Sequence, residues 1–248
     1  MVKENKEENV ALKPEKKQEK KPKKAKIITV KANKKGRHIQ PFLNFLRVLL
    51  IPPFWLLKPF RFYGNRKVAD GACVYICNHY TMFDALYPAV TTWESVHFIA
   101  KRENFETPII GWIFRNIKAI CANRDGNDVR TMLDSIKCLK NGEKIIIFPE
   151  GTRNKTDADM LPFHHGAALM AIKTKTPIIP MMLYKKPRWF RMAHILIGDP
   201  LEMTEYYDRK LSAEEILEAD EKLRQHLLNM RKEHTEFLAS KKAKNKKA

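Results

Sequence analysis

The sequence lacks several features that would assign it to a class directly. None of its apolar runs reaches the roughly 18 residues that a membrane-spanning helix requires, and its 248 residues contain no internal repeat and no glycine-rich nucleotide-binding fingerprint. The first apolar segment starts only at Phe42, after a long polar lead, so we expect no signal peptide. We therefore expect neither a transmembrane protein nor a secreted one.

Cysteine is also scarce. The four cysteines, Cys73, Cys77, Cys121 and Cys138, form no C-x-x-C pair and show no spacing typical of a metal site. Cys73 and Cys77 share one face of an expected strand, and Cys121 lies in another apolar run. We interpret the four as reduced core residues of an intracellular protein, and we expect no metal.

Acidic residues are too few to balance the basic ones, and the formal net charge is +19. Residues 1–40 contain fourteen Lys or Arg and five Glu, and residues 241–248 contain five Lys and no acid, so these ends carry +14 of that charge. Ends of this composition, without aromatic residues, cannot bury enough apolar surface to fold alone. We predict disordered basic tails at 1–37 and 239–248, which either attract polyanions or only aid solubility.

Residues 38–63 form a distinct apolar segment. Two apolar halves are separated by Pro52 and Pro53, and positive charges lie on both sides. We predict two short helices in the membrane interface rather than a helical pair packed on the domain. The expected anchors at the level of the lipid headgroups are Trp55, Lys58, Arg61 and Tyr63.

From residue 64 to 238 short apolar runs alternate with helical patterns. This alternation predicts an α/β domain with a mostly parallel sheet flanked by helices. Asn127–Lys140 has the spacing of an amphipathic helix, and Ser212-x-x-Glu215 is a capping box for a last helix that reaches about Phe237. The expected strands are Val74–Cys77, Val96–Ala100, Ile117–Ala122, Ile145–Phe148, Ile178–Leu183 and His194–Ile197.

A histidine follows the first of these strands. His79 stands at the carboxyl end of the strand, where ligands bind in open α/β folds, and Asp84 follows in the first turn of an expected helix near Phe83–Thr92. Asp84 can accept the ring N–H of His79, which would fix the tautomer and leave the other nitrogen free to take a proton. Taken alone, the pair is better explained as a structural histidine with a capping aspartate, because His and Asp at this spacing occur often by chance.

Cations follow the neighbouring strands. Lys101 and Arg124 come after the second and third strands, and Arg153 follows the fourth within Phe148–Arg153. Because parallel strands place these ends at one edge of the sheet, the pattern favours a substrate that carries a phosphate. Gly151 permits a tight turn whose backbone N–H groups can also face an anion.

No Ser or Cys stands where it could act as a nucleophile beside His79. Asn78 precedes the histidine, and Thr81, the nearest hydroxyl, fits ordinary turn chemistry. Base catalysis on a substrate hydroxyl therefore fits these residues better than an acyl-enzyme route does.

Together these motifs resemble the 1-acylglycerol-3-phosphate O-acyltransferase (lysophosphatidate acyltransferase) family of glycerolipid acyltransferases. The resemblance, which extends from about Phe42 to Leu201, rests on two blocks. The first is Asn78-His79 followed, after four intervening residues, by Asp84, and the second is Phe148-Pro149-Glu150-Gly151-Thr152-Arg153, about seventy residues later. Further matches are Ala100-Lys101 with Glu103, Pro108 with Gly111-Trp112, Arg124, Phe163 with Gly166-Ala167, and Ile179-Pro180-Met181.

The resemblance implies a complete reaction. His79 would be the general base for the sn-2 hydroxyl of lysophosphatidate, Asp84 would orient it, and the hydroxyl would attack an acyl thioester to give phosphatidate. No metal or cofactor is implied, and the donor would be acyl-CoA or acyl carrier protein. The substrate-binding residues would be Lys101, Arg124, Glu150, Gly151, Thr152 and Arg153, and the enzyme would sit on an anionic membrane surface, at the cytoplasmic face of the cell membrane.

Two positions depart from the family pattern, and two other functions stay open. Lys118 stands where the family usually has Gly, and His164-His165 stand where Lys is common.

A related acyltransferase could act on glycerol 3-phosphate or on another lysophospholipid. A more distant alternative is a polyanion-binding protein whose tails bind RNA, although no specific nucleic-acid partner is expected.

Overall fold

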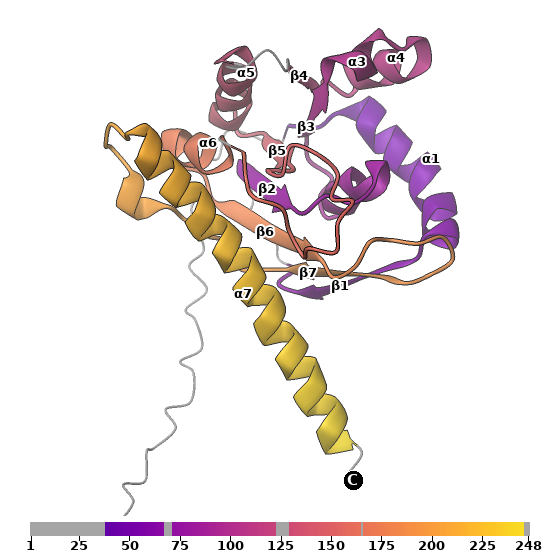
Figure 1. The fold of residues 1–248 in the computed structure, drawn as a ribbon. Helices are drawn as coiled ribbons and strands as arrows, with labels where there is room; N and C mark the ends of the chain where they lie inside the picture. The colour runs from indigo at the N-terminus through magenta and orange to yellow at the C-terminus, as the bar shows by residue number, and fades with distance from the viewer. Residues whose placement is uncertain (1–37, 67–70, 123–128, 165, 246–248) are drawn as a thin grey trace, which may run out of the picture.

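The computed structural model describes residues 38–66, 71–122, 129–164 and 166–245. They form a seven-stranded sheet of order β1-β7-β6-β2-β5-β3-β4 (Figure 1). Strands β6, β2, β5, β3 and β4 run parallel, whereas β7 is antiparallel to β6 and β1 runs parallel to β7. The predicted α/β class with a mostly parallel sheet is confirmed. The strands are β1 (Phe60–Gly64), β2 (Cys73–Cys77), β3 (Val96–Lys101), β4 (Ile120–Ala122), β5 (Lys144–Ile147), β6 (Ile178–Leu183) and β7 (Ala193–Ile197).

Helices lie before, between and after the strands. They are α1 (Pro41–Leu57), η1 (Met82–Ala85), α2 (Leu86–Ala89), α3 (Arg102–Glu106), α4 (Pro108–Asn116), α5 (Val129–Lys140), α6 (Ala167–Thr174), η2 (Thr204–Tyr206) and α7 (Ala213–Asn245). The strand expected from Ile117 begins only at Ile120, because Ile117 caps α4 and Lys118 adopts a left-handed conformation with φ 53°. Left-handed backbone favours glycine, which is the residue common at this position in the resembled family.

Both faces of the sheet are covered, and the alternating side chains of β2 show how. Val74 and Ile76 pack in a core shared with α5, α6 and α7. Tyr75 and Cys77 pack in a second core shared with α1 and α2. All five residues of β2 are buried, as expected of a near-continuous apolar run in a parallel sheet with two covered faces.

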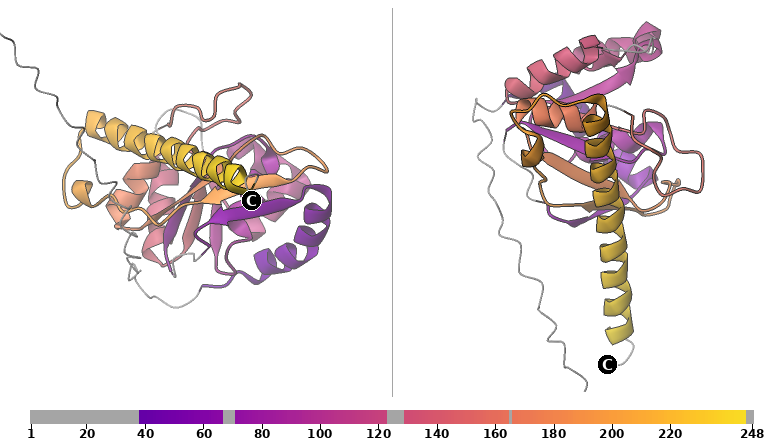
Figure 2. Two further views of the ribbon diagram at one scale, coloured as in Figure 1. Left: turned by 90° about the horizontal axis from the view of Figure 1, so that it is seen from below. Right: turned by 60° about the vertical axis from the view of Figure 1, so that its left-hand side comes forward.

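Helix α7 begins where the sequence predicts and ends later. The Ser212 N–H donates to Glu215 Oε2 at 2.9 Å and the Glu215 N–H donates to Ser212 Oγ at 3.2 Å, which confirms the capping box. The helix then continues past Phe237 to Asn245, into the segment 239–248 expected to be a disordered tail. Its C-terminal part projects away from the sheet in Figure 1 and in the right-hand view of Figure 2. Residues 1–37 lie outside the described part of the chain.

The apolar segment differs from the prediction in two ways. A single helix, α1, runs through Pro52 and Pro53, where the sequence predicts two helices. Leu43 and Phe54 are buried on either side of the prolines and hold both halves against the sheet, which offsets the hydrogen bonds that the prolines remove. The end of the segment, Phe60–Gly64, is the edge strand β1 and therefore belongs to the domain.

Among the described residues, no helix combines the length and the hydropathy needed to cross a bilayer.

Candidate functional site

The end of β2 is fixed to its neighbour by a buried asparagine. Asn78, which is 1% exposed, donates from Nδ2 to the Leu183 carbonyl at 3.0 Å, and its Oδ1 accepts the Leu183 N–H at 2.8 Å. These two bonds continue the pairing of β2 with β6 one residue beyond the strand. The next residue, His79, therefore leaves the sheet at a fixed point on its carboxyl edge.

The carboxylate of Asp84 accepts hydrogen bonds from His79 and from the two residues that follow it. His79 Nδ1 lies 3.2 Å from Asp84 Oδ2, so the predicted hydrogen bond is present. The same oxygen accepts the N–H groups of Tyr80 and Thr81, each at 2.6 Å, and Oδ1 accepts the Thr81 hydroxyl at 2.6 Å. Asp84 is fully buried, which means that these donors replace the water that a carboxylate requires.

The imidazole of His79 is held on its flat side as well. Its ring stacks on Phe148 with a centroid distance of 4.2 Å and an interplanar angle of 24°. The side chain keeps 19% of its surface exposed. Because Asp84 accepts the Nδ1–H, the free base has its lone pair on Nε2, and the buried carboxylate stabilises the imidazolium that forms once Nε2 takes a proton.

Glu150 joins this loop to the one that follows β5. Its Oε1 accepts the backbone N–H of His79 at 2.8 Å, and its Oε2 accepts that of Leu161 at 2.8 Å. The side chain has no exposed surface. Burial raises the pKa of Glu150, while the N–H groups of Leu161 and His79 oppose that shift. Glu150 therefore ties the backbone of His79 to the second loop, and its predicted contact with substrate stays a prediction.

The second loop, residues 151–164, is organised by Asn154. The Asn154 N–H donates to the His79 carbonyl at 2.6 Å, and its buried side chain bonds to Thr156 and Ala158. Gly151 has φ +61°, and a Cβ there would lie 2.8 Å from the ring of His164, so a side chain would be strained as well as crowded. Thr152 and Arg153 are exposed beyond this turn.

The structure describes one of the two remaining predicted cations, Lys101, but not the other, Arg124. Lys101 is the last residue of β3, half-buried, and β3 is separated from β2 by β5 alone. Adjacent strands lie about 4.8 Å apart, which puts the end of β3 roughly 10 Å from that of β2, with the Glu150–Arg153 turn between them. Arg124 and His165 lie outside the described residues.

Lys58 has a different environment from the one predicted. The sequence suggests a headgroup anchor, but the side chain is 3% exposed and its Nζ lies over the rings of Phe83 (4.9 Å) and Trp189 (4.4 Å). Burial lowers the pKa of Lys58, and the charge of Asp84 opposes that shift. The aromatic residues that surround Lys58 in the sequence are the feature that could have predicted its packing against aromatic rings beside the site.

Comparison with known proteins identifies the family of this chain. A family model described as Acyltransferase matches residues 59–184, about half of the chain. A 1-acyl-sn-glycerol-3-phosphate acyltransferase of Bacillus subtilis is 30% identical over 148 residues, which are 56% of this chain and 71% of that protein. The chain belongs to this acyltransferase family.

The chain spans only about a third of the length of some curated relatives that it matches. A chloroplastic 1-acyl-sn-glycerol-3-phosphate acyltransferase of Brassica napus is 36% identical over 123 residues, 48% of this chain, and the match spans only 35% of that longer protein. The crystal structure of the 1-acyl-sn-glycerophosphate acyltransferase PlsC from Thermotoga maritima has the same fold, with a TM-score of 0.57 and 24% identity over 76% of this chain and 79% of that one.

Proposed function

We propose that the protein transfers a fatty acyl group from an acyl thioester to the sn-2 hydroxyl of 1-acylglycerol-3-phosphate, giving phosphatidate for phospholipid biosynthesis. The observation that carries this proposal is the His79–Asp84 pair at the sheet edge, linked through Glu150 to an exposed turn that ends in Arg153. Relatives named 1-acyl-sn-glycerol-3-phosphate acyltransferases support the choice of substrate.

In this reaction His79 moves one proton twice. Nε2 takes the proton of the acceptor hydroxyl as its oxygen attacks the thioester carbonyl, and a tetrahedral oxyanion forms. When the oxyanion collapses, the C–S bond breaks and the leaving thiolate receives the proton from the imidazolium. Asp84 stabilises the imidazolium between the two transfers, so no enzyme nucleophile and no cofactor are required in this scheme.

The phosphate of the acceptor would lie beyond Gly151, against Thr152, Arg153 and Lys101. A guanidinium can bind a phosphate with two parallel hydrogen bonds, and Lys101 adds charge from the neighbouring strand end. The acyl donor, acyl-CoA or acyl carrier protein, is also anionic and would approach the same basic edge.

Arg153→Gln should raise the KM for 1-acylglycerol-3-phosphate about tenfold to a hundredfold, because one charge-assisted contact is worth about 1.5–3 kcal/mol. The kcat should change little. The measurement is acyl transfer from oleoyl- and palmitoyl-thioesters in mixed micelles, with Lys155→Gln, an exposed cation of the same loop, as the matched control.

Acceptor choice tests the proposal as a whole. Wild-type protein should acylate 1-acylglycerol-3-phosphate far faster than glycerol 3-phosphate or lysophosphatidylcholine. Preference for either of the others would assign a different acceptor, and no transfer to any of the three would reject the proposal. An equal KM increase for Lys155→Gln would reject the role of Arg153 alone.

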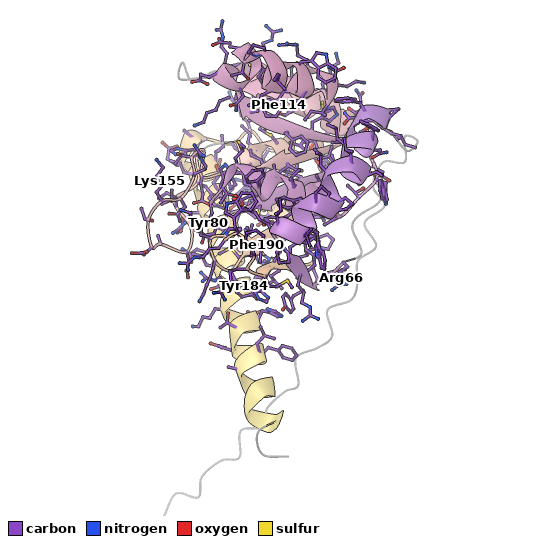
Figure 3. All side chains as sticks on the ribbon, turned by 90° about the vertical axis from the view of Figure 1, so that its right-hand side faces the viewer. Arg66, Tyr80, Phe114, Lys155, Tyr184 and Phe190 are labelled. Carbon is purple, nitrogen blue, oxygen red and sulfur yellow. The ribbon has the colours of Figure 1, made fainter. Side chains whose placement is uncertain are left out.

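The structure also offers a surface suited to a membrane. Exposed apolar side chains extend over three adjacent elements: Phe45, Val48, Leu49, Leu50, Trp55, Leu56 and Leu57 of α1, Ile109, Ile110 and Trp112 of α4, and Trp189, Phe190 and Met192 of the β6–β7 loop. The elements touch, since Phe42 and Trp112 form an edge-to-face pair at 5.3 Å and the Phe190 N–H donates to the Leu57 carbonyl at 2.7 Å. Figure 3 shows Phe190 beside α1 on this side of the molecule.

Basic residues border this apolar surface. Lys185, Lys186, Arg188 and Arg191 of the β6–β7 loop are all exposed. Apolar area flanked by cations is the pattern that binds an anionic lipid surface without crossing it. We infer a peripheral position on the cytoplasmic face of the cell membrane, which would keep the acyl chains of both substrates in lipid.

Leu56→Asp and Ile109→Asp should each weaken binding to vesicles of phosphatidylglycerol and phosphatidylethanolamine about tenfold or more, since burying one such side chain contributes about 1.5–3 kcal/mol. Vesicle co-sedimentation measures the effect. Leu217→Asp on α7, another exposed leucine on a helix, is the control and should bind as wild type does. Equal binding by all three variants would show that this surface does not contact lipid.

A further inference from the structure

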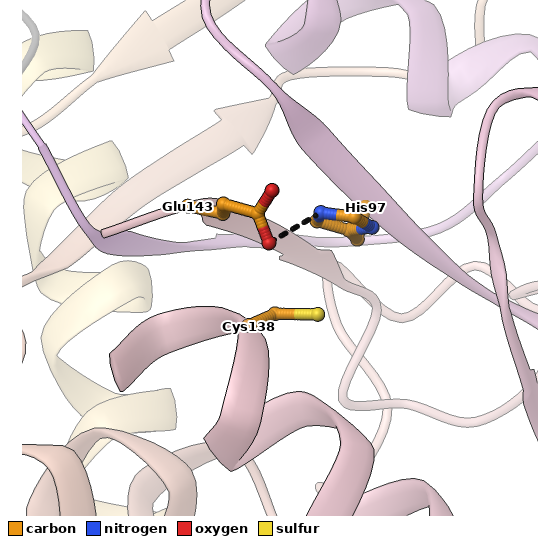
Figure 4. Close-up of side chains that lie close together, drawn as sticks. All are labelled: His97, Cys138 and Glu143. Atoms are coloured by element: carbon orange, nitrogen blue, oxygen red, sulfur yellow. Dashed lines mark ion pairs between the residues drawn. The ribbon is translucent and has the colours of Figure 1, made fainter. Parts of the chain in front are cut away.

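A second cluster of ionisable side chains lies at the amino ends of the strands, whereas His79 lies at the carboxyl ends. His97 is the second residue of β3, Cys138 lies near the end of α5, and Glu143 directly precedes β5 (Figure 4). The catalytic candidates follow the carboxyl ends of the strands, whereas this cluster gathers at their amino ends. The proposed acyl transfer therefore makes no use of it.

The three side chains converge on one point. His97 Nε2 lies 3.1 Å from Glu143 Oε2, and the ligand atoms of His97, Cys138 and Glu143 all lie within 4.8 Å of one another. A tetrahedral zinc ion with bonds of about 2.0–2.3 Å separates its ligand atoms by roughly 3.2–3.8 Å. Small movements of the side chains would thus complete the geometry.

The orientation of His97 is that of a metal ligand. Its Nδ1 lies 2.8 Å from the carbonyl of Lys118 and donates to it, so in the neutral ring the lone pair is on Nε2. The side chain is 4% exposed, and the buried Nε2 makes no aligned hydrogen bond to any described residue; the contact it does make is the ion pair with Glu143 Oε2 at 3.1 Å. A bare Nε2 facing a carboxylate oxygen is repulsive unless a proton or a cation lies between them.

Lys118 adopts its left-handed backbone at this point. A residue other than glycine with φ 53° is strained by roughly 1–2 kcal/mol. The carbonyl of this strained residue accepts the hydrogen bond from Nδ1 that orients His97.

Cys138 and His38 supply the remaining positions. Cys138 is half-buried, and its carbonyl accepts the Glu143 N–H at 3.1 Å, which fixes the two residues side by side. His38 Nδ1 lies 3.9 Å from Glu143 Oε1, and the His38 carbonyl accepts the Ser95 N–H at 2.8 Å, which fixes this residue beside the start of β3.

We propose that His97, Cys138 and Glu143, with His38 as the fourth ligand, bind one zinc ion. The donor set of two imidazoles, one thiolate and one carboxylate suits Zn²⁺ with four protein ligands, as in structural rather than catalytic sites. The thiol proton is released to solvent on binding. The ion would tie the chain that leads into α1 to β3, α5 and the start of β5. The expectation of no metal rested on cysteine spacing and on the family resemblance, and neither reveals ligands such as His97 and Cys138 that are 41 residues apart.

Cobalt titration of the untagged, metal-free protein tests this site. Co²⁺ should bind in a one-to-one ratio and give the thiolate-to-metal charge-transfer band and the strong visible bands of a tetrahedral site, and added Zn²⁺ should displace it. Zn²⁺ should also raise the melting temperature by about 5 °C or more. Cys138→Ser should abolish the charge-transfer band, and Glu143→Gln should weaken Zn²⁺ binding at least tenfold.

Cys121→Ser is the matched control, because Cys121 is an exposed thiol outside the cluster. It should bind Co²⁺ as wild type does. A charge-transfer band that persists in Cys138→Ser, or is lost in Cys121→Ser, would overturn the proposal, as would wild-type protein that binds no ion. That last result would leave an imidazolium–carboxylate pair with a neutral thiol. None of these readouts depends on acyl transfer.

Discussion

Replacing His79 with alanine is expected to lower kcat about a thousandfold or more, with little change in KM, because a positioned general base contributes about 10²–10⁴-fold in rate. The fold should be retained. The bonds that fix this part of the chain to Glu150 and Asn154 come from the backbone of His79 and not from its ring. Acyl transfer to 1-acylglycerol-3-phosphate in mixed micelles measures the loss, and circular dichroism checks the fold.

A second histidine variant makes the result specific. His194 is exposed on β7, where its ring bonds to Tyr63 rather than to Asp84. His194→Ala should transfer acyl groups at close to the wild-type rate. If His79→Ala were equally active while folded, His79 would not be the base and the assignment of the site would be wrong.

Asp84→Asn is expected to remove the negative charge beside His79 while keeping the hydrogen bonds that Asp84 accepts. The amide oxygen can still accept the N–H groups of Tyr80, Thr81 and His79, and the Thr81 hydroxyl can turn to accept from the amide nitrogen. The free energy of unfolding should therefore fall by only about 1–2 kcal/mol. The kcat should still fall about a hundredfold or more, because a neutral amide does not stabilise the imidazolium.

Asp84→Ala should behave differently from Asp84→Asn. It removes both acceptor oxygens and leaves the buried N–H of Tyr80 and the partly buried N–H of Thr81 without partners. An unsatisfied buried group costs about 1–3 kcal/mol, so the variant should unfold at a clearly lower temperature. Thermal melts and rates of both variants check this, with Asp134→Asn on the exposed side of α5 as control. An active Asp84→Asn would leave Asp84 a purely structural capping residue.

The predictable part of the site is the part that is local in sequence. His79 and Asp84 are five residues apart, and the apolar run before His79 ends at the residue where β2 ends. The sequence therefore predicts both the strand end and the bond across it. The parallel order of the strands follows from their alternation with helices, and it places Lys101 and Arg153 at the same edge.

Contacts distant in sequence could not be read in this way. The family resemblance implies a place for Glu150 in the substrate site, but sequence spacing does not predict that its buried carboxylate accepts the N–H groups of His79 and Leu161. Lys58 follows an apolar helix, a pattern typical of a headgroup anchor, but the β6–β7 loop folds over it with Trp189. Strand β1 escaped prediction because its apolar residues continue the pattern of α1.

The bond between Glu150 and the backbone of His79 has a consequence for regioselectivity. It joins His79 directly to the turn that ends in Arg153. The distance between the His79 ring and that turn is therefore fixed by the fold. Under the proposed function, an acceptor can occupy both ends only if its hydroxyl and its phosphate are separated by the matching number of bonds. A lysophosphatidate whose free hydroxyl lies at the other carbon would then reach either the base or the cations, but not both together.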